Sequence, residues 1–216
     1  MMPQHHPDDA LLIEYAGGSL GEAKALLVAT HLALCPACRA AVKAGEAAGA
    51  ELAIEAAEVV EVGPMPDVAP LARQTAQVDV SKMAPVPEPL RGYLGAPMSD
   101  LEWLPVLRGM KEFPLPAFAG RSSVRLLAIE AGRRMPRHTH EGEELTLVLQ
   151  GTFSDRSSVY AKGDVATADL SIDHQPRAGA GEMCLCLSVE DAPLRLTGFN
   201  GALINLASAA RQVLKR

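Results

Sequence analysis

The sequence predicts a two-domain fold, with an N-terminal all-α helical bundle and a C-terminal all-β jelly-roll barrel. Helical signals fill the chain to about residue 57, six prolines interrupt residues 58–89, and short β-like runs recur from residue 124 onward. Prolines exclude long helices from the middle segment. Short strands separated by turn signals are typical of an antiparallel sandwich or barrel.

The changes in composition set the predicted domain boundaries. We predict four segments: a helical domain over residues 1–85, a linker over 86–97, the β-domain over 98–200 and a tail over 201–216. Residues 67–78 carry apolar side chains at helical spacing and could add a fourth short helix to the first domain. A chain of 216 residues is long enough for both domains to have a core.

The formal net charge of −6 is concentrated in the first part of the chain. Residues 1–95 contain twelve Asp and Glu against six Lys and Arg, whereas the remainder contains fourteen of each. This excess disfavours direct binding of nucleic acid and suits a basic protein partner. No run approaches the ~20 apolar residues of a bilayer span, and no signal segment is visible at the start. We therefore expect a cytoplasmic protein without a membrane partner.

Three helices are predicted in the N-terminal domain. Acidic residues open a first helix near residue 9, Ser19-Leu-Gly-Glu22 has the form of a capping box before a second helix, and Pro36 suits the first turn of a third. Helices joined by tight turns should pack up-down-up. The start of the first helix, the end of the second and the start of the third then meet at one end of the bundle.

That junction contains one of His5 and His6, together with His31, Cys35 and Cys38. Two imidazoles and two thiolates form the closed tetrahedral set of structural zinc sites, and zinc would stabilise a bundle whose core is thin. The alternative for the two cysteines is a thioredoxin-like redox dithiol. That motif belongs between a strand and a helix, whereas this one lies between two helices. We therefore predict a structural Zn²⁺ site.

A second metal site is predicted between Gly132 and Gly151, which bracket a strand-like stretch as turn residues. His138, His140 and Glu144 lie at even offsets within it. An extended chain sends such side chains to one face. Two imidazoles and a carboxylate on one face suit a divalent first-row metal, and the spacing alone does not select which one.

The same stretch resembles the first signature of the cupin superfamily: Gly, five residues, His-x-His, three residues, Glu, six residues, Gly. In the second cupin signature a His follows a Gly at an interval that Gly163 and His174 keep, although other positions of that signature differ. The resemblance implies a cupin jelly-roll barrel that holds Zn²⁺ or another divalent first-row metal. It implies four metal ligands: His138, His140, Glu144 and His174.

The arrangement of His6 and His31-x-x-x-Cys35-x-x-Cys38, joined to a cupin signature in one chain, resembles the ChrR-type zinc-containing anti-sigma factors. The resemblance covers most of the chain and assigns the N-terminal ligand to His6 rather than His5. It implies that the helical domain binds an extracytoplasmic-function sigma factor and blocks its access to core RNA polymerase. It also implies that the cupin domain is needed for release of the sigma factor under oxidative, singlet-oxygen-type stress.

Other functions are also compatible with these residues. Cupins with three histidines and a glutamate include dioxygenases and isomerases, so the alternative is a cupin metalloenzyme with a helical zinc regulatory domain. No acid–base set beyond the ligands is evident, and we favour a regulator that is not an enzyme. A metal-storage protein would account for both sites but not for the linker.

A second pair of cysteines, Cys184 and Cys186, shares one face of a predicted strand. Buried free cysteines commonly act as small hydrophobic side chains, and this is the interpretation we favour. The functional alternative is that both thiols lie near the cupin metal and are oxidised with it. The spacing of two residues does not decide between these interpretations.

Overall fold

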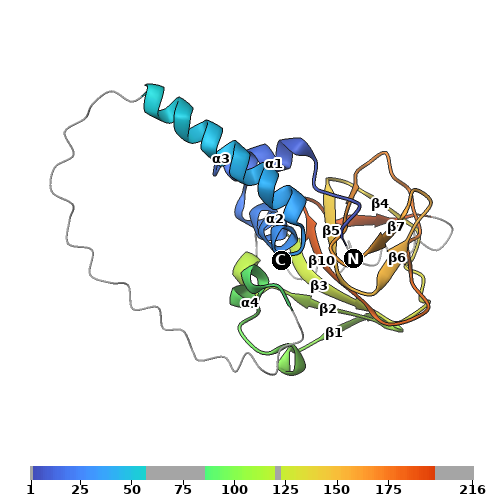
Figure 1. Cartoon of the computed structure of the whole chain (residues 1–216). Coiled ribbons are helices and arrows are strands. Elements are labelled where there is room, and N and C mark those ends of the chain that lie inside the picture. The colour runs from blue at the N-terminus through green and yellow to red at the C-terminus, as the bar shows by residue number, and fades with distance from the viewer. Residues whose placement is uncertain (1, 57–85, 120–122, 198–216) are drawn as a thin grey trace, which may run out of the picture.

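The computed structural model describes residues 2–56, 86–119 and 123–197. In this part of the chain the α-helices are α1 Asp9–Ala16, α2 Glu22–Leu34, α3 Pro36–Ala56 and α4 Glu88–Leu94. The first three lie together on one side of a body of strands, and α3 projects well beyond that body (Figure 1). None of the described helices is both long and apolar enough to cross a membrane.

The helix starts follow local sequence signals. The Asp8 carboxylate accepts a hydrogen bond from the backbone N–H of Leu11 at 2.8 Å, which caps α1. The predicted start of α3 at Pro36 is confirmed. The predicted capping box before α2 is wrong, because the N-cap residue is Gly21 rather than Ser19, and no side chain caps the helix. The Ser19 hydroxyl instead donates to the Glu14 carbonyl at 3.2 Å.

The strands form three antiparallel sheets. The six-stranded sheet has the order β1-β2-β3-β10-β5-β8, a second sheet is β7-β6-β9, and the third pairs β11 with β4. The strands are β1 Leu104–Leu107, β2 Met110–Pro114, β3 Ser123–Ile129, β4 His138–His140, β5 Glu144–Gln150, β6 Thr152–Ser154, β7 Val159–Ala161, β8 Val165–Ala168, β9 Arg177–Ala178, β10 Cys184–Glu190 and β11 Leu194–Leu196. Short 3₁₀ turns span Met98–Asp100 and Pro116–Phe118.

These sheets form a β-sandwich, and among the described residues no sheet closes on itself to make the predicted jelly-roll barrel a closed one. Within the described residues the large sheet ends at β1 on one edge and β8 on the other. Its two faces have separate cores, because side chains alternate between the faces of a strand. Leu145 and Leu147 of β5 face the helices. Val148 lies on the opposite face of the same strand and packs with Phe153 and Cys186 inside the sandwich.

The helices share a core with the large sheet. Leu26 and Leu27 of α2 are buried in the same cluster as Leu145 of β5 and Leu187 of β10. Residues 86–97, which we predict as a linker, contain α4, and Leu90 of α4 is fully buried in this cluster. That part of the expected linker is therefore packed structure, because its leucines fall on one helical face.

Several sequence predictions concern residues outside the described ranges. The domain boundary near residue 85, the fourth helix over residues 67–78 and the tail over 201–216 all lie there. These three predictions therefore stay as they were stated from the sequence.

Candidate metal centres

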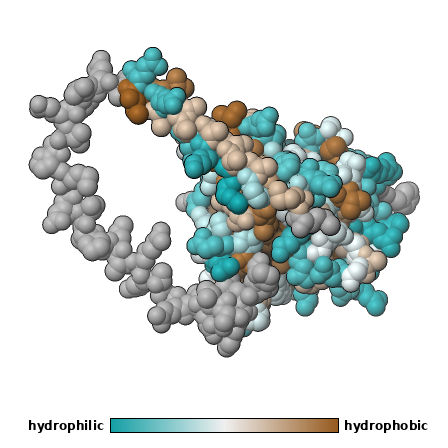
Figure 2. Space-filling view, viewed as in Figure 1, coloured by the Kyte–Doolittle hydropathy of each residue, from teal (hydrophilic) through white to brown (hydrophobic). Residues whose placement is uncertain are grey.

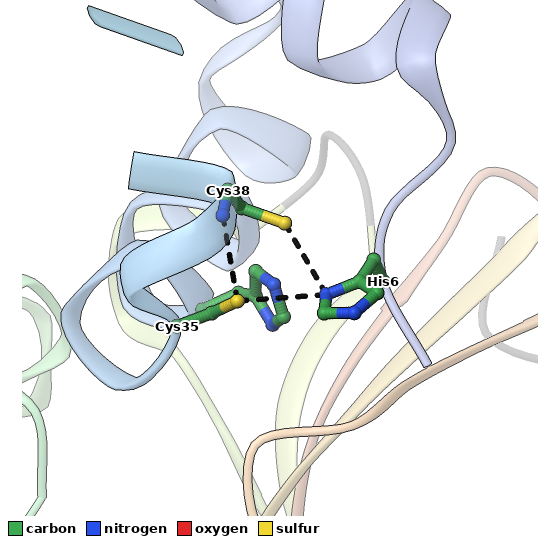
Figure 3. A group of neighbouring side chains, drawn as sticks. His6, Cys35 and Cys38 are labelled. Atoms are coloured by element: carbon green, nitrogen blue, oxygen red, sulfur yellow. Dashed lines mark hydrogen bonds between the residues drawn. The ribbon is translucent and has the colours of Figure 1, made fainter. Parts of the chain in front are cut away.

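His6, His31, Cys35 and Cys38 come together where the three N-terminal helices meet. Each offers one ligand atom, and these four atoms all lie within 4.8 Å of one another. The Nδ1 atom of His6 lies 3.5 Å from the Cys35 sulfur and 3.3 Å from the Cys38 sulfur (Figure 3). The up-down-up packing of α1, α2 and α3 explains this convergence. His6 precedes α1, and His31 lies in the last turn of α2. Cys35 and Cys38 lie just before and within the first turn of α3.

The His31 imidazole is fully buried and has one nitrogen without a partner. Its Nδ1 atom lies 2.8 Å from the Gly163 carbonyl oxygen, 132 residues away in the chain. A carbonyl only accepts, so Nδ1 carries the proton and Nε2 offers a lone pair. Nε2 is buried and has no hydrogen-bond partner among the described residues, which is costly unless a cation is bound. Metal-bound histidines commonly donate their other N–H in this way.

The two thiols also fit a cation. Burial and the neighbouring Cys35 thiol raise the pKa of Cys38 to about 12. The redox alternative is disfavoured by position, because the two cysteines lie between α2 and α3 rather than between a strand and a helix. A bound metal would instead hold the sulfurs as thiolates. Burial likewise lowers the pKa of His31, which favours the neutral imidazole that ligates metals. The four side chains are therefore compatible with a metal site.

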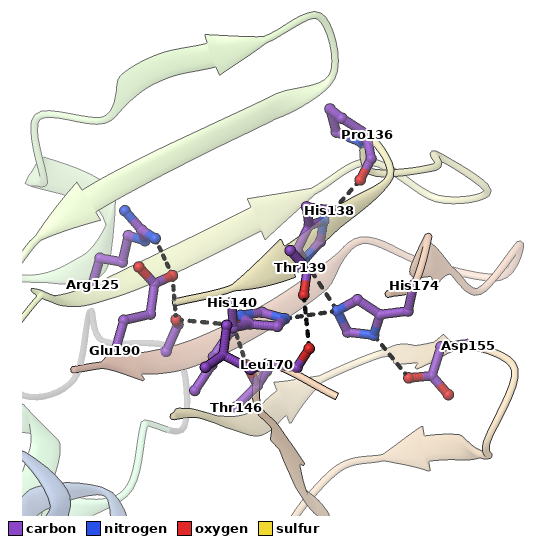
Figure 4. A network of polar contacts seen from close by, with 12 residues as sticks. Arg125, Pro136, His138, Thr139, His140, Thr146, Asp155, Leu170, His174 and Glu190 are labelled. Atoms are coloured by element: carbon purple, nitrogen blue, oxygen red, sulfur yellow. Dashed lines mark hydrogen bonds and ion pairs between the residues drawn. The ribbon is translucent and has the colours of Figure 1, made fainter. Parts of the chain in front are cut away.

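A second group consists of three histidines inside the sandwich. The Nε2 atom of His174 lies 3.1 Å from Nε2 of His138 and 3.1 Å from Nε2 of His140. His138 and His140 belong to β4, and His174 is bridged to His138 by two backbone hydrogen bonds of 3.0 Å. The three rings point toward one another (Figure 4).

The Nδ1 atom of each of these rings has an acceptor beside it. His138 Nδ1 lies 2.8 Å from the Pro136 carbonyl oxygen, and His140 Nδ1 lies 3.0 Å from a carboxylate oxygen of Glu144. His174 Nδ1 lies 3.1 Å from a carboxylate oxygen of Asp155. With all three Nδ1 atoms donating, three Nε2 lone pairs converge on one point. Such a donor set suits a first-row divalent cation.

The Glu144 carboxylate lies beside the three histidines and lines the same cavity as His138 and His174. One of its carboxylate oxygens contacts His140, and the other accepts hydrogen bonds from Thr146 at 2.8 Å and Ser188 at 3.3 Å. Glu144 is not a member of the group of converging ligand atoms. Burial alone would raise its pKa, but the contact with His140 lowers the pKa of Glu144 to about 2. Glu144 thus contacts His140, and His174 lies close to His138 and His140. The assignment of Glu144 and His174 as metal ligands stays a prediction.

Asp155 is a site residue that the sequence does not reveal. Its carboxylate contacts His174 and also accepts from the backbone N–H groups of Ser157 at 2.8 Å and Ser158 at 3.1 Å. An Asp followed by serines is an ordinary Asx-turn signal. It predicts the turn between β6 and β7 but carries no information about a histidine that lies nineteen positions further along the chain.

The three-histidine group faces a small cavity of about 40 Å³, lined mainly by apolar side chains that include Phe153 and Cys186. A water molecule needs roughly 10–15 Å³ by this measure, so the cavity has room for an ion and one or two small ligands. A hollow of about 360 Å³ adjoins it at His174 and Asp155. Four arginines line that hollow: Arg134, Arg137, Arg156 and Arg177.

The other cysteine pair lies beside this cavity. Cys184 and Cys186 are buried on the inner face of β10, with their sulfurs 3.5 Å apart. Cys186 lines the cavity together with Glu144. The two thiols are therefore both packed hydrophobic side chains and neighbours of the candidate centre, and each of the two interpretations of this pair has a structural basis.

Comparison with known proteins identifies the class and then the family. A family model described as the ChrR cupin-like domain matches residues 94–192, so the chain is a cupin-domain protein with an N-terminal helical module. The anti-sigma-E factor ChrR of Cereibacter sphaeroides is 41% identical over 208 residues, which cover 94% of this chain and 97% of that relative. The chain belongs to the ChrR family of anti-sigma factors.

A solved structure supports the same assignment. The crystal structure of Rhodobacter sphaeroides SigE in complex with the anti-sigma ChrR aligns with a TM-score of 0.72 at 41% identity. The alignment covers 88% of this chain and 100% of the matched chain. The similarity therefore spans both the helical module and the cupin-like β-sandwich.

Proposed function

We propose that this chain is an anti-sigma factor that binds an extracytoplasmic-function sigma factor through its N-terminal helices and inhibits it. The strongest support is the four-ligand group at the junction of three helices, in a chain 41% identical to the anti-sigma-E factor ChrR. Zn²⁺ would be held by His6, His31, Cys35 and Cys38. Two imidazoles and two thiolates leave no open position, as in structural zinc sites.

The α3 helix offers an apolar surface for such a partner. Leu52 and Ile54 near its end are 66% and 77% exposed. Hydrophobic patches are visible at this projecting end (Figure 2). Because Leu52 and Ile54 lie two positions apart on the helix, these side chains point to different sides of it and would contact a partner that surrounds the helix end. The acidic balance of residues 1–95 also suits a partner with a basic surface.

We propose that the cupin domain holds a second ion, Zn²⁺ or another divalent first-row metal, and is needed for release of the sigma factor under oxidative, singlet-oxygen-type stress. His138, His140 and His174 would bind the ion, and Glu144 would orient His140. The bound ion would supply positive charge and Lewis acidity in the cavity. The contact between Gly163 and His31 supports a role in release, because it joins the cupin to the zinc group.

A cupin metalloenzyme of the dioxygenase or isomerase type is the alternative. Among the side chains that line the cavity, the carboxylates are Glu144 and Asp155. Both already orient imidazoles, so neither is free to act as an acid or base on a substrate. Family membership and this use of the carboxylates favour the regulator.

The proposal is tested by copurifying sigma factors with the full-length chain and measuring its zinc content. We expect the double change Cys35→Ser and Cys38→Ser to remove zinc from the helical group and to abolish sigma-factor binding, because the helix junction loses its ion. The matched control is Cys184→Ser with Cys186→Ser, which should keep both. Binding of a sigma factor at unchanged affinity by the first variant would contradict the structural role of zinc.

A further inference from the structure

The N-terminal segment that carries His6 is bound to the cupin domain. The backbone N–H groups of Gln4 and His5 donate to one carboxylate oxygen of Asp164 at 2.6 and 3.0 Å. The backbone N–H of Val165 donates to the His5 carbonyl at 3.0 Å. Since the Gly163 carbonyl also accepts from His31, residues 163–165 of the cupin contact both the His31 imidazole and the backbone next to His6.

His5 is the side chain through which this contact extends toward the cupin cavity. Its Nε2 atom lies 2.7 Å from the Ser158 hydroxyl, and its ring lies against Tyr160 with the centroids 4.6 Å apart. Its Nδ1 atom is 3.4 Å from the Asp164 carboxylate. The His5 side chain is therefore held by contacts with three residues of the cupin domain, next to the proposed zinc ligand His6.

Ser158 belongs to the turn that orients the cupin histidines. Asp155 accepts from the Ser158 backbone N–H at 3.1 Å with one carboxylate oxygen and contacts His174 Nδ1 at 3.1 Å with the other (Figure 4). A continuous series of contacts thus runs from His174 through Asp155 and Ser158 to His5. It ends one residue from His6.

We propose that Ser158 and His5 are positioning residues that couple the two metal centres, so that a change at His174 alters how tightly the Cys35 and Cys38 group holds zinc. This inference rests on the proposed function, because it takes both groups as metal centres. When the His174 ring turns, Asp155 loses a partner and the turn at Ser158 can shift. The shift reaches His6 through its neighbour His5.

The first test measures the zinc affinity of the Cys35 and Cys38 group in the full-length chain by competition with a chromophoric chelator. It compares the unmodified chain with His174→Gln, Ser158→Ala and the double variant. Coupled sites typically change each other's affinity by a factor on the order of 5 to 150. We expect a change in that range for His174→Gln alone. In the Ser158→Ala background His174→Gln should have almost no further effect.

Ser157→Ala is the matched control, because the Ser157 hydroxyl also donates to Asp155, at 2.5 Å, but is linked to His5 only indirectly, through the Tyr160 hydroxyl at 3.3 Å. His174→Gln should keep its full effect on zinc affinity in the Ser157→Ala background. The coupling would be overturned if His174→Gln changed zinc affinity as much in the Ser158→Ala background as in the unmodified chain. It would also be overturned if His174→Gln left zinc affinity unchanged in the unmodified chain.

A second measurement leaves His174 unchanged and so does not depend on the folding of that variant. One equivalent of Co²⁺ is bound at the thiolates, where it gives a thiolate-to-metal absorption band, and a second equivalent is then added. We expect the second ion to shift this band in the unmodified chain and in Ser157→Ala but not in Ser158→Ala. A bound second ion with an unchanged band overturns the coupling. Failure of the second ion to bind, measured by equilibrium dialysis, contradicts the cupin centre itself.

Discussion

Gly163 has a backbone conformation and a close contact that no larger residue can accommodate. Its φ is +94°, and a Cβ at this position would meet Cγ of Pro3 at 2.7 Å. We predict that Gly163→Ala lowers the free energy of unfolding by about 1–3 kcal/mol, the usual cost of such strain. It should also weaken zinc binding, because the Gly163 carbonyl holds His31.

Urea unfolding and chelator competition check this prediction for Gly163→Ala. Gly181→Ala is the control, since a Cβ at Gly181 would meet nothing within 4 Å. Equal stability and equal zinc affinity for the two alanine variants would show that residue 163 does not support the zinc group.

Asp164 gives the stability a specific pH dependence. Burial alone would raise its pKa, but hydrogen bonds from the backbone of Ala161, His5 and Gln4 hold the pKa of Asp164 below its usual range. A carboxyl whose pKa is lower in the folded chain stabilises the fold above its unfolded pKa of about 3.9 and loses this contribution as the pH falls through the folded value.

We predict that Asp164→Asn lowers the free energy of unfolding at neutral pH by about 1–3 kcal/mol, through loss of a charged acceptor for buried donors. The difference between the unmodified chain and the variant should shrink as the pH is lowered below about 4. Urea unfolding across this pH range measures it. A difference that stays constant with pH would mean that the Asp164 charge does not contribute.

At the scale of elements, α2 joins the helices to the large sheet. Leu27 is fully buried in the core that includes Leu145 and Leu187 of the sheet. We predict that Leu27→Ala costs about 2–5 kcal/mol, as large-to-small core substitutions do. Denaturant unfolding followed by the fluorescence of Trp103, the single tryptophan, measures this cost. Ile13→Ala is the control because Ile13 is 69% exposed, and a similar loss in both variants would contradict the shared core.

The projecting end of α3 does not contribute to the shared core, because its apolar residues Leu52 and Ile54 are exposed. We predict that Leu52→Ser with Ile54→Ser weakens binding of the sigma factor about tenfold or more, in the range of interface hot spots, and leaves the stability almost unchanged. Leu104→Ser on β1, where Leu104 is 50% exposed, is the control and should bind normally. Calorimetric titration distinguishes the variants, and unchanged affinity in the α3 variant would place the partner elsewhere.

Local signals in the sequence predict elements better than they predict contacts. The three N-terminal helices, the start at Pro36 and the β-like runs follow from caps, proline positions and alternation. The pairing of β10 with both β3 and β5 does not, because it joins segments far apart in the chain. The alternation of side chains along a strand places Glu144 on the face of His138 and His140, but it does not predict the contact between Glu144 and Nδ1 of His140.

At the scale of the whole molecule, the sequence predicts which residues form the two groups of candidate metal ligands. It does not predict the contacts that connect the helices with the cupin domain. His31, Cys35 and Cys38 lie within one short motif, so connectivity brings them together. The support that His31 receives from Gly163 crosses 132 residues, and the sequence does not predict the contacts of His5 with Ser158 and Asp164. The helices pack on one face of the large sheet, and the cupin cavity lies on the other. The group formed by His6, His31, Cys35 and Cys38 is therefore supported by contacts from both parts of the chain.

The anti-sigma function is tested most directly by transcription in vitro with RNA polymerase and the extracytoplasmic-function sigma factor that copurifies with the chain. We predict that about one equivalent of the zinc-replete chain per sigma factor reduces transcription from the promoter of that sigma factor to background. Transcription by the same polymerase with its housekeeping sigma factor should be unchanged. Full transcription from the first promoter in the presence of excess chain would contradict the proposed function.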